Sequence, residues 1–178
     1  MRVPALYDRI GIGYTTTRRE EPRIARAIGE ALAGACTVLN VGAGTGSYEP
    51  RDRDVVAVEP SAAMIAQRPG DRAPAVRASA ENLPFPDQSF DAAMAVLSDH
   101  HWRNRVQGLR ELRRVARHRV VLFNTDPAQA NQFWLTTEYL PEFFELIPAP
   151  YREPAYWEDE LARELGAVQS VPVPVPHD

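Results

Sequence analysis

Apolar and polar positions along the first two thirds of the chain follow a pattern in which strands are separated by helices. Runs rich in β-branched residues predict strands at 37–41, 54–58, 74–78, 91–97 and 119–123. Apolar residues at helical spacing predict helices over 18–34, 62–68 and 103–117. Strands that alternate with helices indicate an α/β fold with right-handed crossovers, a parallel sheet and ligand sites at the carboxyl ends of the strands.

The loop after the first predicted strand is the most informative segment. It carries glycine at every second position, at Gly42, Gly44 and Gly46, and the next strand ends in Glu59. Glycine allows a sharp turn and a close approach of the backbone to a ligand. An acid at the tip of the following strand can accept hydrogen bonds from both hydroxyls of a ribose. The combination predicts a cofactor that contains a nucleoside.

The glycine loop departs from the dinucleotide fingerprint. That fingerprint, G-x-G-x-x-G/A, requires Gly or Ala where this chain has Ser47, and it leads into a helix whose amino end holds the pyrophosphate. Segment 48–54 contains Pro50 and three acids, and it predicts little more than one helical turn. A pyrophosphate is disfavoured there, whereas a zwitterionic amino-acid tail is not. The loop therefore favours S-adenosylmethionine over NAD and argues against an NAD-linked oxidoreductase.

Three blocks carry a family resemblance: Val38–Ser47, Val55–Ser61 and Ala78–Asp91, the last with the residues ENLPF and SFD. They resemble class I S-adenosylmethionine-dependent methyltransferases that act on small molecules, related to the methyltransferases of ubiquinone and menaquinone biosynthesis. Segment Tyr7–Gly11 is also similar to the opening segment of that family. The resemblance implies a three-layer, Rossmann-like, doubly wound and mostly parallel sheet, with S-adenosylmethionine as the cofactor.

The resemblance also implies a set of cofactor contacts in each block. The glycine loop is expected under the methionine part and ribose, Glu59 and Pro60 at the ribose hydroxyls, and Ala80 and Glu81 at the adenine edge. The remaining expected contacts are Asn40, Met64, Ser79, Leu97, Ser98, Tyr14 and Arg18. Of these, Met64 equally suits the core.

Two of these positions differ from the family pattern, which has an acid at Asn40, near the cofactor's ammonium group, and at Ser79, near the adenine amino group. Asparagine and serine keep an acceptor oxygen but lose the charge, which weakens the expected bonds. Cofactor affinity is therefore expected to be modest. These departures keep a second interpretation open, in which the chain is a non-catalytic module that binds the cofactor or its product, or dimerises.

Two residues are candidates for catalysis. Methyl transfer from a sulfonium needs mainly in-line positioning and, for some acceptors, a base. His101, after the fourth predicted strand, resembles the family position that approaches the substrate, although a structural hydrogen bond is an alternative role. Asp126, after the fifth, faces the expected pocket, but Asp-Pro also suits a turn.

The chain is expected to form one domain with four parts: a cap and helix (1–34), the cofactor-binding core (35–126), an aromatic-rich helical lid (127–162), and an edge strand with a proline-rich tail (163–178). The lid predicts a partly apolar small-molecule substrate, with ordinary helix packing as the alternative. A sixth strand is expected to begin at Ala167–Val171, where alternating prolines make the terminal strands truncated or atypical. An uncovered strand there would allow a homodimer.

Composition excludes several classes. Among 178 residues the net charge is −4, all basic side chains are arginine, and no basic stripe indicates nucleic-acid binding. No apolar run approaches the ~20 residues of a membrane span, and the first residues lack the apolar core of a signal peptide, so a cytoplasmic location is expected. Cys36 is the single cysteine, which predicts no disulfide and no metal centre.

Overall fold

The structure, a computed structural model, describes residues 20–125 and 154–174. The chain divides into two compact units, Met1–Phe123 with Pro172–Asp178, and Asn124–Val171. The first unit contains the sheet and all the described site residues considered below. Each unit is described by itself.

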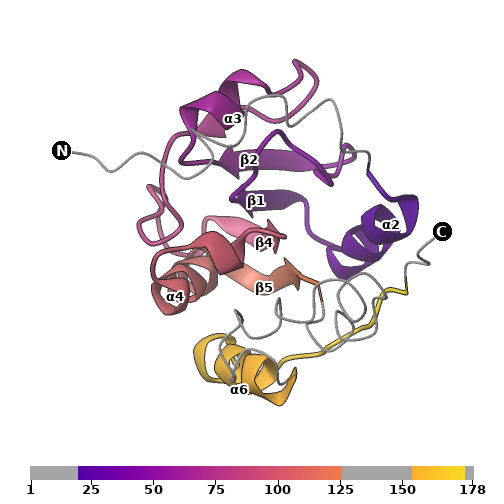
Figure 1. Cartoon of the computed structure of the whole chain (residues 1–178), viewed down its shortest axis with the longest axis vertical. Coiled ribbons are helices and arrows are strands. Elements are labelled where there is room, and N and C mark those ends of the chain that lie inside the picture. The colour runs from indigo at the N-terminus through magenta and orange to yellow at the C-terminus, as the bar shows by residue number, and fades with distance from the viewer. Residues whose placement is uncertain (1–19, 126–153, 175–178) are drawn as a thin grey trace, which may run out of the picture. The chain divides into compact units, whose positions relative to one another are not determined.

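Five parallel strands form the sheet of the first unit (Figure 1). They are β1 (Thr37–Val41), β2 (Asp54–Val58), β3 (Ala75–Val76), β4 (Phe90–Val96) and β5 (Ala116–Phe123). Their order is β3-β2-β1-β4-β5, so the direction of winding reverses between β1 and β4. In a doubly wound sheet, this reversal marks where ligands bind, beyond the carboxyl ends of the two strands. The three-layer, Rossmann-like α/β fold is confirmed.

The helices of this unit begin at capping residues. They are α2 (Pro22–Ala31), α3 (Ala62–Ala66), the 3₁₀ turn η2 (Asp99–His101) and α4 (Arg105–Val115). The side chains of Glu21, Ser61 and Asn104 accept hydrogen bonds from the first-turn amides of α2, α3 and α4, respectively. The helix predicted over 18–34 ends at Ala31, and the chain then turns through Gly34, whose φ is 83°.

The core is built from alternate positions of the central strands. Val38 of β1 and Met94 of β4 pack with Ile28 and Leu32 of α2. Because side chains alternate across a strand, Leu39 points to the other face of the sheet, and it is also fully buried. Right-handed crossovers that run in opposite directions from the β1–β4 boundary place α3 and α4 on opposite faces.

The connection from β1 to β2, residues 42–53, contains no helix. This agrees with the turn predicted from Pro50 and the acids around it. Parallel strands are normally joined by a crossover helix, so here the face of the sheet that the helix would cover must be filled in another way.

The predicted sixth strand is wrong. Residues 166–174 follow α6 (Pro154–Leu165) as a bend and a segment without regular secondary structure or strand pairing. Val168 and Val171 are exposed, and Pro172 and Pro174 have no amide to donate to a ladder. The described tail therefore provides no strand through which a second copy could pair. Most of the predicted lid, 127–162, lies outside the described residues.

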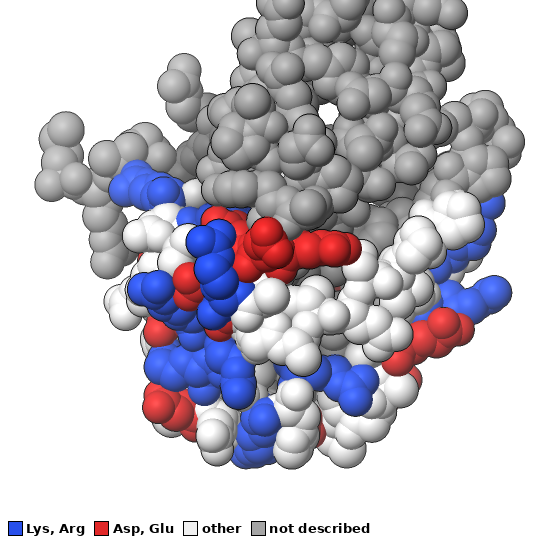
Figure 2. Space-filling model, turned by 90° about the horizontal axis from the view of Figure 1, so that it is seen from below, with Lys and Arg blue, Asp and Glu red and all other residues white. Residues whose placement is uncertain are grey.

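Charged side chains of both signs are interspersed on the face shown in Figure 2. No basic stripe of the kind that follows a nucleic-acid backbone is seen on the described part of that face. None of the described helices has the length and apolar character that crossing a bilayer requires.

Candidate active site

The three glycines of the loop after β1 all have positive φ: 71° at Gly42, 52° at Gly44 and 96° at Gly46. The amides of Gly42 and Ala43 donate to the carbonyl of Val58, which ties the start of the loop to the end of β2 (2.9 and 3.0 Å). A Cβ on Gly42 would lie 2.6 Å from the Cβ of Ser98, after β4. The backbone conformation thus requires glycine, and the loop sits where β1, β2 and β4 end.

Glu59 is held over this loop by backbone amides. Its Oε2 accepts from the amide of Gly44 (2.8 Å) and its Oε1 from the amide of Ser61 (2.8 Å). The residue is 5% exposed. A carboxylate has about four acceptor positions, so two backbone donors can fix its orientation while it remains able to accept from a ligand hydroxyl.

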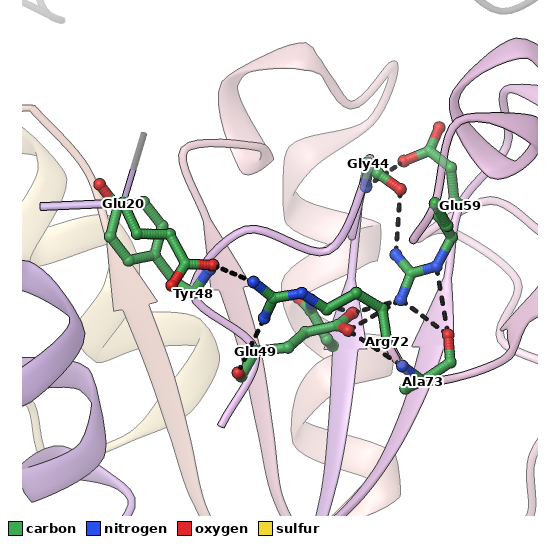
Figure 3. A network of polar contacts seen from close by, with 9 residues as sticks. Glu20, Gly44, Tyr48, Glu49, Glu59, Arg72 and Ala73 are labelled. Carbon is green, nitrogen blue, oxygen red and sulfur yellow. Dashed lines mark hydrogen bonds and ion pairs between the residues drawn. The ribbon is translucent and has the colours of Figure 1, made fainter. Parts of the chain in front are cut away.

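Asn40, at the penultimate position of β1, belongs to a buried polar network that sequence reasoning missed. Its Nδ2 donates to Glu49 Oε1 (3.0 Å), and Arg68 Nη2 donates to both oxygens of Glu49 (2.7 and 2.8 Å). Arg68 also donates to the carbonyls of Gly44 (3.0 Å) and Ala73 (2.8 Å). Figure 3 shows this network around Gly44, Glu49 and Ala73.

The same network extends to the segment before α2. Arg72 donates to the carbonyl of Glu49 and to the carboxylate of Glu20, and Glu20 accepts from the amide of Tyr48 (Figure 3). In the sequence, these charges resemble an ordinary solvated surface, because nothing local distinguishes a buried arginine from an exposed one. The partners of Glu49 lie 9, 19 and 24 positions away along the chain.

The loop between β3 and β4 carries three predicted contacts with the cofactor's adenine. Ala80 is buried, whereas Ser79 is exposed. Glu81 accepts from the amide of Asn104 at the start of α4 (3.2 Å). Burial raises the pKa of Glu81, but hydrogen bonds from its own backbone, the Asn104 amide and the Ser79 hydroxyl outweigh it, so the pKa lies below its usual range.

The rest of this loop is fastened to α4 by an ion pair. Glu111 accepts from the amide of Leu83 (2.8 Å), and Arg114 donates to the carbonyls of Leu83 and Phe85 (3.1 and 2.7 Å). Hydrogen bonds to Glu111 and Asp87 raise the pKa of the Arg114 guanidinium. Segment 78–91, which resembles the family most closely, therefore has a structural role, because its contacts with α4 fix the conformation of the loop.

The turn after β4 faces the glycine loop. Leu97 has a φ of 51°, which is strained for a bulky residue. Ser98 Oγ donates to the carbonyl of Val41 at the end of β1 (2.9 Å). Asp99 is fully buried and accepts from Arg105 Nε (2.8 Å). The turn is therefore fixed both to β1 and to α4.

Trp102 ends this turn and was not predicted as a site residue. A Cβ on Gly42 would lie 3.6 Å from its Nε1, and a Cβ on Gly108 of α4 would lie 2.3 Å from its Cε3. The indole therefore reaches from α4 to the glycine loop. The signal in the sequence is a glycine inside a predicted helix, which often marks a close approach of another group.

Two adjacent histidines lie in the turn, with ring centroids 3.9 Å apart. Partial burial of its ring and the neighbouring His100 lower the pKa of His101, against the opposing effect of Asp99. A neutral imidazole at pH 7 could accept a proton. Among residues 20–125 and 154–174, no group of three or more His, Cys, Asp or Glu side chains could hold a metal ion.

The structure thus brings most predicted site residues to one edge of the sheet. The set comprises Asn40, Gly42, Gly44, Gly46, Glu59, Pro60, Met64, Leu97, Ser98 and His101, on β1, β2, β4 and the segments that follow them. Met64 is 3% exposed, with its Cε 3.2 Å from the position a Cβ on Gly44 would take. Tyr14, Arg18 and Asp126 lie outside the described residues.

A cavity of about 430 Å³ lies elsewhere. It is lined by the first residues of β2, Asp54 and Val55, and by the connection before them, whereas the glycine loop follows the carboxyl end of β1. Two of its arginines already have partners, Arg51 with Asp71 and Arg72 with Glu20. We therefore do not assign this cavity to the cofactor.

Comparison with known proteins identifies the fold family. Residues 39–123 match the family model described as a methyltransferase domain. This part of the chain is similar to class I methyltransferase domains. The cofactor of such domains is S-adenosylmethionine, and the donor set fits it: a fixed carboxylate at Glu59, an amide at Asn40 and a glycine loop between them.

The chain is similar to several methyltransferases. It is 29% identical over 116 residues to the uncharacterised methyltransferase YcgJ of Bacillus subtilis, a match that covers 59% of this chain and 42% of that protein. A protein from Anabaena variabilis, described as a methyltransferase of an antibiotic biosynthesis pathway, has a TM-score of 0.71 at 28% identity, with 84% of this chain and 63% of that one covered.

A methyltransferase from Thermotoga maritima shares the fold, with a TM-score of 0.62 at 21% identity over 79% of this chain and 67% of that one. The chain spans less than half the length of YcgJ and under two thirds of the Anabaena protein.

Proposed function

We propose that the protein transfers a methyl group from S-adenosylmethionine to a small organic acceptor in the cytoplasm. The observation that carries the proposal is the Glu59 carboxylate, fixed by two backbone amides beside a glycine loop at the switch point of the sheet. Both hydroxyls of a ribose can donate to such a carboxylate. The similarity to methyltransferases supports the same cofactor.

In this proposal the domain holds the cofactor by its own groups. Glu59 accepts from the ribose, Asn40 accepts from the ammonium group, and the loop from Ser79 to Glu81 borders the adenine. The bound cofactor supplies an electrophilic methyl group on a sulfonium. The turn from Leu97 to Trp102 orients the acceptor, and His101 takes its proton where the acceptor must lose one.

The first experiment is isothermal titration of the purified chain with S-adenosylmethionine and S-adenosylhomocysteine. One-site binding of both is expected. Absence of binding to a demonstrably folded protein would refute the proposal. Titration with NAD serves as the control, because an oxidoreductase of this fold would bind NAD instead.

Replacing Glu59 tests the carboxylate directly. Glu59→Ala removes an acceptor of charge-assisted bonds and is expected to weaken binding by about 1.5–3 kcal/mol, which is roughly 10–100-fold in Kd. The exposed Glu30, on α2, provides a control that removes the same charge as Glu30→Ala. Equal affinities for the two variants would remove Glu59 from the binding site.

A second function is a non-catalytic module that binds the cofactor or its demethylated product. The neutral Asn40, in place of the acid that relatives carry, favours it. The two functions separate when labelled S-adenosylmethionine is incubated with the protein and a small-molecule extract. Labelled product above a Glu59→Ala blank indicates a transferase, whereas binding without turnover indicates a module.

A further inference from the structure

Asn40 has its amide orientation fixed by a single partner. It lies in the central strand with 2% of its surface exposed, and its Nδ2 donates to Glu49 Oε1 (3.0 Å). Because a carboxylate accepts and only the amide nitrogen can donate, this bond sets Nδ2 toward Glu49 and Oδ1 away from it. Among the described residues, no hydrogen bond uses Oδ1.

The orientation of the Glu49 carboxylate is also fixed, because donors reach both of its oxygens. Arg68 bridges its two oxygens, and the amide of Ala73 donates to Oε2 (3.3 Å). The side chains of Arg68 and Glu49 are 6% and 3% exposed, so the pair is buried. Arg68 also donates to the carbonyl of Gly44, and one guanidinium thereby fixes both the glycine loop and the partner of Asn40.

We propose that Glu49 and Arg68 are positioning residues that present Asn40 Oδ1 to the ammonium group of the cofactor. The inference rests on the proposed function, since it assigns a role within that site. In the family pattern, the acid stands on β1 itself. In this chain the negative charge lies on Glu49, which accepts a hydrogen bond from Asn40, and Arg68 balances that charge. The group that accepts from the ammonium is therefore the neutral Oδ1 of Asn40, and the ion pair between Glu49 and Arg68 fixes its orientation.

This arrangement predicts that restoring the acid of the relatives will not help. Asn40→Asp would replace the donor with a second carboxylate about 3 Å from Glu49, and like charges this close oppose each other. Glu49→Gln would leave Arg68 buried beside a neutral amide. The double variant Asn40→Asp with Glu49→Gln exchanges the two groups, because the new amide can donate to the new carboxylate and accept from Arg68.

The test compares two ligands that differ at the amino-acid tail. S-adenosylhomocysteine carries the ammonium group, whereas 5′-methylthioadenosine shares the nucleoside and thioether but lacks it. We expect each single variant to bind S-adenosylhomocysteine at least tenfold more weakly than wild type, with less than a threefold change for methylthioadenosine. The exchange variant is expected to favour S-adenosylhomocysteine at least as strongly as wild type does.

Thermal unfolding without ligand establishes that each variant folds, and Glu30→Gln controls for the loss of one charge far from the network. Equal losses for both ligands, or no loss for either, would overturn the positioning role while leaving the proposed function intact. If Glu49→Gln does not fold, the exchange variant alone decides: a tenfold lower preference for S-adenosylhomocysteine than wild type refutes the proposal. Failure of wild type to bind either ligand would refute the proposed function instead.

Discussion

Two helical glycines, Gly108 and Gly29, allow the effect of the contact between Trp102 and α4 to be measured by itself. Both glycines lie within helices, α4 and α2, where glycine is about 0.8–1 kcal/mol less favourable than alanine. A Cβ on Gly29 would meet nothing within 4 Å. A Cβ on Gly108 would lie 2.3 and 2.7 Å from Cε3 and Cζ3 of Trp102. The two substitutions to alanine therefore share the gain in helix propensity and differ only in the clash.

The size of the clash follows from these distances. Carbon atoms pack at about 3.5–4.0 Å, so the indole must retreat by more than about 1 Å. Overpacking of this kind costs about 1–3 kcal/mol. Gly29→Ala is expected to raise the free energy of unfolding by about 1 kcal/mol, and Gly108→Ala to lower it by up to about 2 kcal/mol. A difference of about 1–3 kcal/mol should separate them.

Urea unfolding followed by circular dichroism measures both free energies, and titration with S-adenosylhomocysteine reports on the site. Because Trp102 reaches the glycine loop, Gly108→Ala should also weaken ligand binding, whereas Gly29→Ala should not. Equal stabilisation by the two substitutions would show that the indole does not pack on Gly108, and the reasoning about this turn would then be wrong.

Three further outcomes follow from single residues. Gln88 is exposed with a φ of 52°, so Gln88→Gly should raise the unfolding free energy by about 0.5–1 kcal/mol in urea titrations; a decrease would contradict the strain. Amides of Thr37 and Cys36 lower the pKa of Asp91 to about 2, so its stabilisation is complete above its unfolded pKa and is lost as pH falls toward 2. Asp91→Asn should therefore reduce the number of protons taken up on unfolding in that pH window by nearly one, which flattens the dependence of the unfolding free energy on pH. Arg114→Lys should cost about 1–2 kcal/mol, because an ammonium cannot bridge the same set of acceptors; Arg113→Lys, at a position with none of these acceptors, is the control expected to be silent.

The strands could be predicted because their signal is local. β1 and β2 match the predicted ranges, since apolar runs buried on both faces contrast sharply with the polar segments around them. β5 begins at Ala116, three residues earlier than predicted, because the start of its ladder carries exposed Arg117, His118 and Arg119. The Val-Pro alternation after residue 170 has strand-like composition, but proline cannot donate, and no strand forms over its described part.

The site could be predicted only where it is built from one segment. Glycines and the acid at the end of the next strand form a local motif, whereas Glu49 with Arg68, and Trp102 with Gly108, are pairs that only the folded chain brings together. The acids of segment 48–54 were interpreted as unfavourable to an anionic ligand. One of them, Glu49, is instead buried and accepts a hydrogen bond from Asn40 near the end of β1.

The missing crossover helix also affects how the chain folds. Val38 pairs with Val55 on β2 and with Ala92 on β4, at sequence separations of 17 and 54 residues. Loop-closure entropy grows with the logarithm of loop length, so the first pairing costs about 1 kcal/mol less than the second. We expect β1 and β2 to pair early, with β4 and α4 joining afterwards, and phi-value analysis of the two ladders would reveal this order. Parallel strand pairs ordinarily form slowly, because their strands lie far apart in the sequence. The β1–β2 connection without a helix makes this pair one of the more local contacts of the sheet.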